Sequence, residues 1–195
     1  MKTLFASIAV LPLFGLFAVN VPSGKVSVKG VHLCCGGCQS AAKDAFDGLK
    51  NVSAISVDLN TKVISFTVDK ADKAESVLKT LAAAGFYGTA TMDGKPISYP
   101  DAGARKGAKS NSLTLTGLHL CCTSCVTGSQ KALQGVRGVS LIDIDRNEGT
   151  IRLTGDAISH EAAVGALHKA GFACSIAKEK KQTELSTTLG LPTRP

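Results

Sequence analysis

The sequence predicts an α+β fold in which one β-α-β-β-α-β unit occurs twice. The motif His-Leu-Cys-Cys-x-x-Cys is found at residues 32–38 and again at 119–125. Around both copies, apolar residues alternate as in strands or recur at helical spacing, and they do so in the same order. A Gly-Phe pair closes the second helical segment of each copy, at Gly85 and at Gly171. Since 195 residues suffice for two small domains, we interpret these features as a tandem repeat.

The first unit is expected over residues 22–92. The motif lies between an alternating strand and an amphipathic helix, and Asn60-Thr61 forms the turn of a hairpin. A second helix, closed by Gly85, precedes a last short strand. In chain order we expect a strand over 25–31, a helix over 38–50, strands over 55–59 and 64–68, a helix over 69–84 and a strand over 86–92.

The second unit, residues 112–177, repeats this order. Its helices are expected over 125–135 and up to Ala170, the latter capped by Ser159 or Asp156. Its strands are marked by the alternating residues Leu113, Leu115, Ile142, Ile144, Ile151 and Leu153 and by the segment opened by Gly171-Phe172. Such a repeat folds into two ferredoxin-like sandwiches in tandem, each a four-stranded antiparallel sheet with two helices on one face. The cysteine loop and the Gly-Phe turn then share one edge of the sheet.

The remaining segments predict an exported protein. Residues 1–21 combine Lys2 with the apolar run Leu4–Val19, which is shorter than the roughly 20 residues that span a bilayer. We interpret them as a signal peptide and the mature protein as periplasmic or secreted, with an uncleaved N-terminal anchor as the alternative. Residues 93–111 are expected to form a linker and 178–195 a disordered tail.

Composition argues against nucleic acid as a partner and against catalysis. The formal net charge is +7, but the basic residues gather in the expected linker and tail, and the chain has no Trp and two Tyr for stacking on bases. Paired carboxylates, a Gly-rich phosphate loop and a Ser/His/Asp set are missing from the sequence. We therefore expect a binding protein, not an enzyme.

The cysteine spacing predicts a site for a soft metal ion. Cys35/Cys38 and Cys122/Cys125 each place two sulfurs where a loop enters a helix, and the positive end of that helix favours thiolate. Two thiolates without a nearby carboxylate favour Cu(I), Hg(II), Cd(II) or Zn(II) over magnesium or calcium.

Two other uses of the cysteines stay open. In an oxidising compartment a disulfide is the default for any cysteine pair, but the chain has seven cysteines, and three within five residues close no long loop. A thiol-disulfide oxidoreductase using the same pairs is the main alternative function, although no Trp or suitably placed Pro accompanies them.

Each unit resembles the heavy-metal-associated domain of copper chaperones, metal-pumping ATPases and exported mercury-binding proteins, whose loop reads Gly-Met-x-Cys-x-x-Cys. The resemblance covers about residues 24–92 and 112–177, with Leu33 and Leu120 in place of the Met and the cysteine pairs in the ligand positions. It implies one ion held near-linearly between two sulfurs, Cu(I) first and Zn(II) or Hg(II) next. It also implies handover by ligand exchange to a metal transporter or a second metal-binding protein.

The motif departs from the family pattern in two places. His32 and His119 stand where the family has Gly, and Cys34 and Cys121 stand at a variable position. These residues complete a three-sulfur or Cys/His site, or they lie beside the ligands or on the surface, because neighbouring residues of an extended loop point apart.

Three further features bear on the site. Cys174 follows Gly171-Phe172-Ala173 at the same edge and is either an additional ligand or a buried, inert cysteine. Phe86 and Phe172 are expected to cover the loops. A flexible linker of 19 residues reaches about 25 Å on average, so the two loops can also face each other and share an ion.

Overall fold

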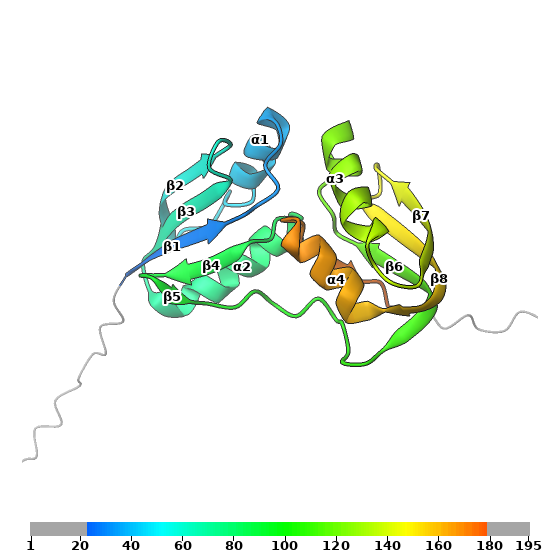
Figure 1. The fold of residues 1–195 in the computed structure, drawn as a ribbon. Helices are drawn as coiled ribbons and strands as arrows, with labels where there is room; N and C mark the ends of the chain where they lie inside the picture. The colour runs from blue at the N-terminus through cyan, green and yellow to red at the C-terminus, as the bar shows by residue number, and fades with distance from the viewer. Residues whose placement is uncertain (1–22, 179–195) are drawn as a thin grey trace, which may run out of the picture.

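The computed structural model describes residues 23–178 and contains two antiparallel sheets, each with two α-helices (Figure 1). The signal peptide and the disordered tail predicted from the sequence lie outside the described residues, apart from Lys178 at the start of the tail. Over the described part of the chain, no helix is long and apolar enough to cross a membrane.

The first unit follows the predicted β-α-β-β-α-β order and adds one short strand. Its sheet has the order β2-β3-β1-β4-β5, and all neighbouring strands are antiparallel. The elements are β1 (Gly24–Lys29), α1 (Gly36–Asp44), β2 (Val52–Asp58), β3 (Val63–Val68), the 3-10 turn η1 (Ala71–Lys73), α2 (Ala74–Ala83), β4 (Thr89–Met92) and β5 (Lys95–Pro96).

The second unit repeats this order with the sheet β7-β8-β6-β9. The cap of its last helix is Ser159, whose Oγ accepts a hydrogen bond from the backbone N–H of Ala162 at 3.3 Å, as N-cap chemistry favours. The elements are β6 (Lys109–Thr116), α3 (Thr123–Gln134), β7 (Val139–Asp145), β8 (Thr150–Ser159), α4 (His160–Lys169) and β9 (Ser175–Ile176).

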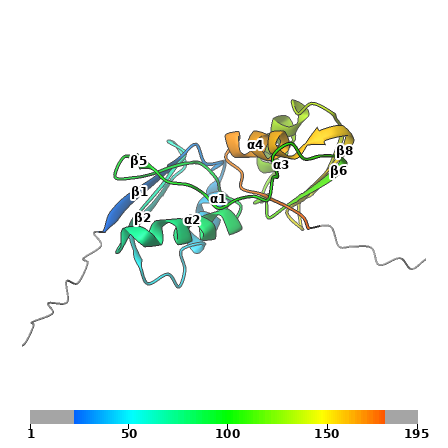
Figure 2. The same cartoon turned by 90° about the horizontal axis from the view of Figure 1, so that it is seen from below.

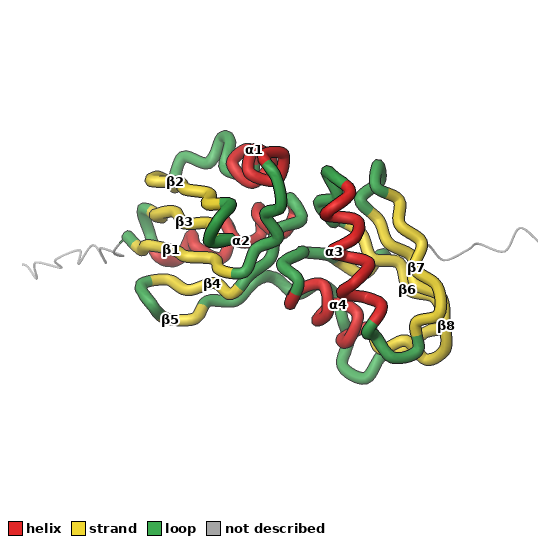
Figure 3. Tube along the Cα trace, turned by 45° about the horizontal axis from the view of Figure 1, so that its top comes forward, coloured by secondary structure: helices red, strands yellow, loops and turns green. Residues whose placement is uncertain are grey.

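The core of each unit lies between its sheet and its helices. Alternate residues of the central strands face inward, among them Val26 and Val28 of β1 and Ile151 and Leu153 of β8, all fully buried. In Figures 1 and 3, α3 and α4 lie on the side of the second sheet that is turned toward the first unit. The cysteine loops leave β1 and β6 and enter α1 and α3 at this inner side of the molecule.

The structure differs from the sequence prediction at Ile55. The predicted alternation of β2 is interrupted by a register shift between Ser53 and Ser56, where Ala54 adopts a left-handed conformation with φ of 50°. Ile55 is turned outward as a result and is 40% exposed.

The expected linker over 93–111 is largely ordered. Asp93 and Gly94, with φ of 49° and 80°, form a tight turn that lets β5 pair with β4, as type I′ turns do. Farther on, Ala102 is buried and its carbonyl accepts a hydrogen bond from Ile176 N–H at 2.9 Å. The chain between β5 and β6 thus passes from one unit to the other along a defined path (Figure 2).

The Gly-Phe turns of the two units pair with each other. The N–H of Tyr87 donates to the carbonyl of Gly171 at 3.2 Å, and the N–H of Ala173 donates to the carbonyl of Gly85 at 3.0 Å. Phe86 and Phe172 form an antiparallel bridge between these contacts. The two units are therefore docked through backbone hydrogen bonds. Each unit donates one of these bonds to the other, as the approximate symmetry of the repeat requires.

A pH-dependent contact lies beside this pairing. The Tyr87 and His168 rings, one from each unit, stack at a centroid distance of 3.7 Å, and burial lowers the pKa of His168 below its usual 6.5. Below that pH the unfolded chain binds a proton that the folded chain resists, so folding stability is full above about pH 6.5 and is lost as the pH falls. We expect His168→Phe, which keeps the stack, to make this loss shallower in denaturant titrations of the metal-free protein between about pH 7 and pH 5. An unchanged slope would contradict this role of His168.

Candidate metal centre

The cysteine loops have the same backbone form in both units. Cys35 and Cys122 are the N-cap residues of α1 and α3, each in extended conformation and without a side-chain cap. The last motif cysteines, Cys38 and Cys125, lie one turn inside these helices and are fully buried. The intervening Gly36-Gly37 and Thr123-Ser124 form the first helical turn, which brings each Cys-x-x-Cys pair to one helix end.

The two loops face each other, and their six sulfurs converge. Within a unit, the Sγ atoms of Cys35 and Cys38 lie 3.8 Å apart, and those of Cys122 and Cys125 lie 3.7 Å apart. Between units the Sγ separations are as short: Cys34–Cys122 3.3 Å, Cys34–Cys125 3.4 Å, Cys38–Cys121 3.4 Å, Cys35–Cys121 3.6 Å and Cys38–Cys125 3.7 Å. All six are free thiols, so the structure brings both predicted ligand pairs into a single cluster, the six-sulfur cluster.

Cys34 and Cys121 belong to this cluster. The expectation that neighbouring cysteines point apart is wrong at this distance, because the sulfurs of Cys34 and Cys35, and those of Cys121 and Cys122, lie within 4.8 Å of each other. Cys34 and Cys121 also contact sulfurs of the opposite unit. Each of the two also contacts the helical cysteine of its own unit, Cys34 with Cys38 at 3.5 Å and Cys121 with Cys125 at 3.6 Å. The extra cysteine of the motif thus takes part in four of the five sulfur contacts between the units.

The motif histidines pack against the opposite unit. The His32 ring stacks on Phe172 at 4.1 Å, and the His119 ring lies 4.9 Å from Phe86. The Nε2 atoms of both histidines are buried and have no hydrogen-bond partner in the described part of the chain. A ligand nitrogen of His32 lies within 4.8 Å of the sulfurs of Cys34 and Cys125. The two phenylalanines do cover a cysteine loop, but the loop is that of the other unit.

The thiols differ in acidity. A hydrogen bond from the backbone of Cys125 holds the pKa of Cys122 at about 6, and backbone and thiol hydrogen bonds outweigh burial to lower the pKa of Cys38. Burial raises the pKa values of Cys34 and Cys121, which also donate to neighbouring sulfurs, and burial raises that of Cys125. The expected lowering at the helix start is therefore wrong for Cys125. Ions that bind here must displace protons from the raised thiols.

Two cations that we did not predict from the sequence hold the loops. Lys62 Nζ donates to the carbonyl of Leu33, while Arg146 donates through Nε to the carbonyl of Leu120 at 3.1 Å and through a terminal nitrogen to that of Cys121. Both residues come from the turn between the second and third strands of their unit. In the sequence, the presence of a basic residue in each of these turns was the signal that could have predicted these contacts. Each basic residue fixes the backbone of a cysteine loop through a motif carbonyl.

We expect the double variant Lys62→Met and Arg146→Met to bind Cu(I) about tenfold more weakly or worse, since each of these charged hydrogen bonds contributes about 1 kcal/mol. The measurement is competition with a chelator of known Cu(I) affinity. Lys70→Met with Arg137→Met removes the same charge at the far ends of β3 and α3 and should leave the affinity within about twofold. Equal weakening in the two double variants would mean that net charge alone is responsible.

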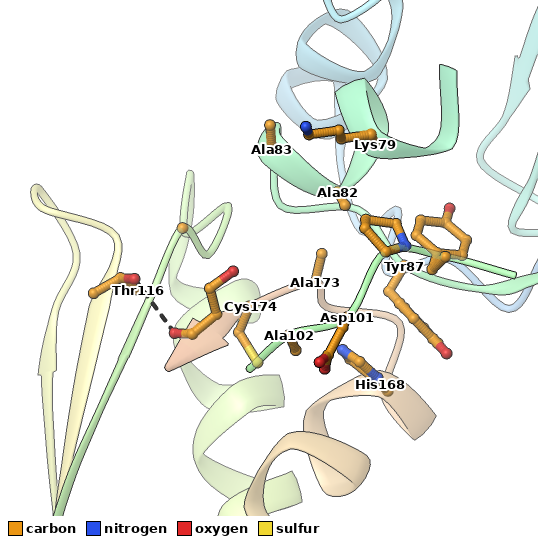
Figure 4. A pocket seen from close by; sticks show the side chains of 14 residues that line it. Lys79, Ala82, Ala83, Tyr87, Asp101, Ala102, Thr116, His168, Ala173 and Cys174 are labelled. Carbon is orange, nitrogen blue, oxygen red and sulfur yellow. Dashed lines mark hydrogen bonds between the residues drawn. The ribbon is translucent and has the colours of Figure 1, made fainter. Parts of the chain in front are cut away.

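Cys174 lies apart from the six-sulfur cluster. Among the described residues, the groups whose ligand atoms are close enough to hold one ion do not include it, so its possible ligand role is not supported. Cys174 lines a cavity of about 250 Å³ between the units together with Tyr87, Ala102 and His168 (Figure 4). Burial raises its pKa to about 12, in keeping with an inert thiol.

The fold of the first unit and its paired cysteines define a class, the proteins that bind heavy metals through cysteine. The family model of the heavy-metal-associated domain matches residues 25–87. This match contains Cys35 and Cys38 and ends before the second unit begins.

Solved structures similar to this chain include the following three. Oxidized MerP from Ralstonia metallidurans CH34 is 26% identical, with 36% of this chain and all of that chain covered and a TM-score of 0.33. A copper binding domain from HMA7, a P-type ATPase, is 19% identical over 37% of this chain and 99% of that one, with a TM-score of 0.33. The N-terminal soluble domains of Bacillus subtilis CopA are 13% identical over 83% and 98%, with a TM-score of 0.30.

Proposed function

We propose that this protein binds soft metal ions, Cu(I) first, through its motif cysteines and sequesters or shuttles them without catalysing covalent chemistry. The observation that carries the proposal is the convergence of six free thiols at sulfur separations of 3.3 to 3.8 Å. Thiolates select Cu(I), Zn(II) and similar ions over oxygen-seeking cations. Lone buried cysteines would be inert, but six in contact form a donor set.

The second unit takes part as a second heavy-metal-associated-like domain under this proposal. Its element order, its motif and its loop contacts repeat those of the first unit, which supports the interpretation of the chain as a tandem of ferredoxin-like domains. Export to the periplasm or the exterior is part of the proposal and rests on the sequence of residues 1–21 alone. The partner is then a metal transporter or a second metal-binding protein that presents thiols of its own.

The test is an anaerobic titration of the reduced protein with Cu(I) and separately with Zn(II), read by bound metal and by sulfur-to-metal charge-transfer absorption. We expect tight Cu(I) binding in the native sequence and clearly weaker binding in the double variant Cys35→Ser and Cys122→Ser. Cys174→Ser is the matched control, because it removes a buried thiol outside the six-sulfur cluster. Binding that is unchanged in the double variant would overturn the proposal.

A further inference from the structure

We propose, resting on the function above, that the two units hold one shared polynuclear Cu(I)-thiolate cluster and not one ion each. The whole six-sulfur cluster is the site, and neither unit completes it alone. The argument rests on sulfur separations, on which sulfurs are mutual neighbours and on the glycines that let the units meet.

The sulfur separations do not suit a linear ion between two cysteines. With a metal–sulfur bond of about 2.3 Å, two sulfurs on opposite sides of an ion lie about 4.6 Å apart, whereas sulfurs of a three- or four-coordinate ion lie about 3.8 to 4.0 Å apart. The Cys-x-x-Cys pairs are separated by 3.8 and 3.7 Å. These distances fit an ion that takes at least one further sulfur.

The further sulfur comes from the opposite unit. Within the first unit Cys38 contacts both other motif cysteines, but Cys34 and Cys35 are not in contact with each other, and the second unit has the same pattern. Triangles in which every sulfur separation is 3.8 Å or less form only across the units, although the sulfurs of Cys121, Cys122 and Cys125 also lie within 4.8 Å of one another. The triangles across the units are Cys34/Cys122/Cys125, Cys35/Cys38/Cys121, Cys34/Cys38/Cys125 and Cys38/Cys121/Cys125.

These triangles set the composition of the cluster. Three-coordinate Cu(I) in each triangle gives about four ions per chain, with most sulfurs bridging two or more ions. Bridging cations also offset the repulsion between sulfur anions that lie within 3.8 Å of one another. A ring nitrogen of His32 lies within 4.8 Å of the sulfurs of Cys34 and Cys125, so His32 stands beside this arrangement as a further donor.

Two glycines let the loops come this close. Gly85 and Gly171 have φ of 87° and 86°, and a Cβ on either would lie 2.3 Å from the backbone nitrogen of a histidine of the opposite motif, His119 or His32. The N–H of His32 donates to the carbonyl of Gly171 at 3.1 Å. A side chain at these positions would therefore push the two sets of sulfurs apart.

A shared cluster changes how metal leaves the protein. An incoming ligand reaches the ions fully only after the units separate, because Cys38 and Cys125 are buried between them. A cluster of this kind favours sequestration, with release by a partner that replaces one unit at the sulfurs.

The first test is anaerobic Cu(I) titration followed by native mass spectrometry of three proteins. The native chain is compared with Gly85→Ala plus Gly171→Ala and with the matched control Gly48→Ala plus Gly117→Ala, positions with φ of 77° where a Cβ meets nothing within 4 Å. We expect about four ions loaded cooperatively in the native chain and the control, and about one ion per unit, loaded stepwise, in the first variant. Independent loading of two ions by the native chain would overturn the inference and leave the proposed function standing. Absence of any Cu(I) or Zn(II) binding would overturn both.

A second variant covers the case in which the glycine variant fails to fold. Cys34→Ser with Cys121→Ser leaves both Cys-x-x-Cys pairs intact, so independent sites would keep their two ions at full affinity. Every triangle contains Cys34 or Cys121, and we expect the cooperative loading of about four ions to disappear. Unchanged stoichiometry and cooperativity in this variant would overturn the inference.

Discussion

Replacing Cys38 or Cys125 with serine is expected to lower Cu(I) affinity by about 100-fold or more, the largest effect of any single cysteine change. Loss of a residue that merely orients a ligand costs about 10- to 100-fold in metal affinity, and loss of a central ligand costs at least as much. Cys38 contacts Cys34, Cys35, Cys121 and Cys125, whereas Cys35 contacts only Cys38 and Cys121 among the sulfurs. Cys35→Ser alone should therefore have a smaller effect than Cys38→Ser.

The relative loss of Cu(I) affinity in these variants tests whether Cys38 is central to the six-sulfur cluster. Chelator competition on Cys38→Ser, Cys35→Ser and Cys174→Ser, each first shown to be folded by circular dichroism, measures all three affinities. Independent Cys-x-x-Cys sites predict equal losses for Cys38→Ser and Cys35→Ser, because a two-sulfur ion loses half of its ligands in either case. Equal losses would therefore contradict the central position of Cys38.

The order of the elements could be predicted from the sequence because local signals and tertiary packing agree. Alternation in β3 and helical spacing in α2 place the same side chains inward that the structure buries, among them Phe66 and Leu78. Gly85 and Gly171 mark the ends of the second helices for a local reason, since the positive φ at these positions suits glycine. The repeated motif then locates the same loop twice.

The sequence allowed the two loops to face each other and share an ion, but the convergence of all six sulfurs could not be predicted in this way. Adjacent cysteines of an extended loop are expected to point apart, so Cys34 and Cys35 of a single unit suggest two directions and not one site. Only the docking of the second unit, through Gly171 and the Gly-Phe pairing, places sulfurs in both directions. The spacing of apolar residues in the sequence predicts strands and helices but not contacts between units. The prediction of a flexible linker over residues 93–111 was wrong for the same reason. The composition of this segment is typical of linkers, but Ala102 is buried against the second unit.

The third cysteine of the motif gains a physical explanation from this docking. A two-sulfur site needs only the Cys-x-x-Cys pair, and an additional exposed thiol would invite oxidation. Cys34 and Cys121 instead provide the shortest sulfur contacts between the units, at 3.3 and 3.4 Å. Their side chains bring the donor sulfurs of the two small domains into contact.

Loading with Cu(I) is expected to raise the midpoint of thermal unfolding by about 10 °C. A ligand that binds only the folded state at 1,000 times its dissociation constant adds about 4 kcal/mol of stability, and each kcal/mol shifts the midpoint of a protein of this size by about 2–4 °C. Because shared ions tie the units together, the loaded protein should unfold in one transition, whereas we expect the metal-free protein to unfold unit by unit. Anaerobic scanning calorimetry measures both quantities.

The control for this prediction separates stabilisation by binding from coupling of the units. Cys34→Ser with Cys121→Ser still binds Cu(I) at the Cys-x-x-Cys pairs if these act alone, so each unit gains stability separately and two transitions persist. If the two transitions merge in the native chain but not in this variant, the units are coupled by the sulfurs that contact the opposite unit. Cys34, for example, contacts Cys122 and Cys125. Two metal-stabilised transitions in the native chain would show instead that each domain keeps its own ion, whatever the proximity of the loops.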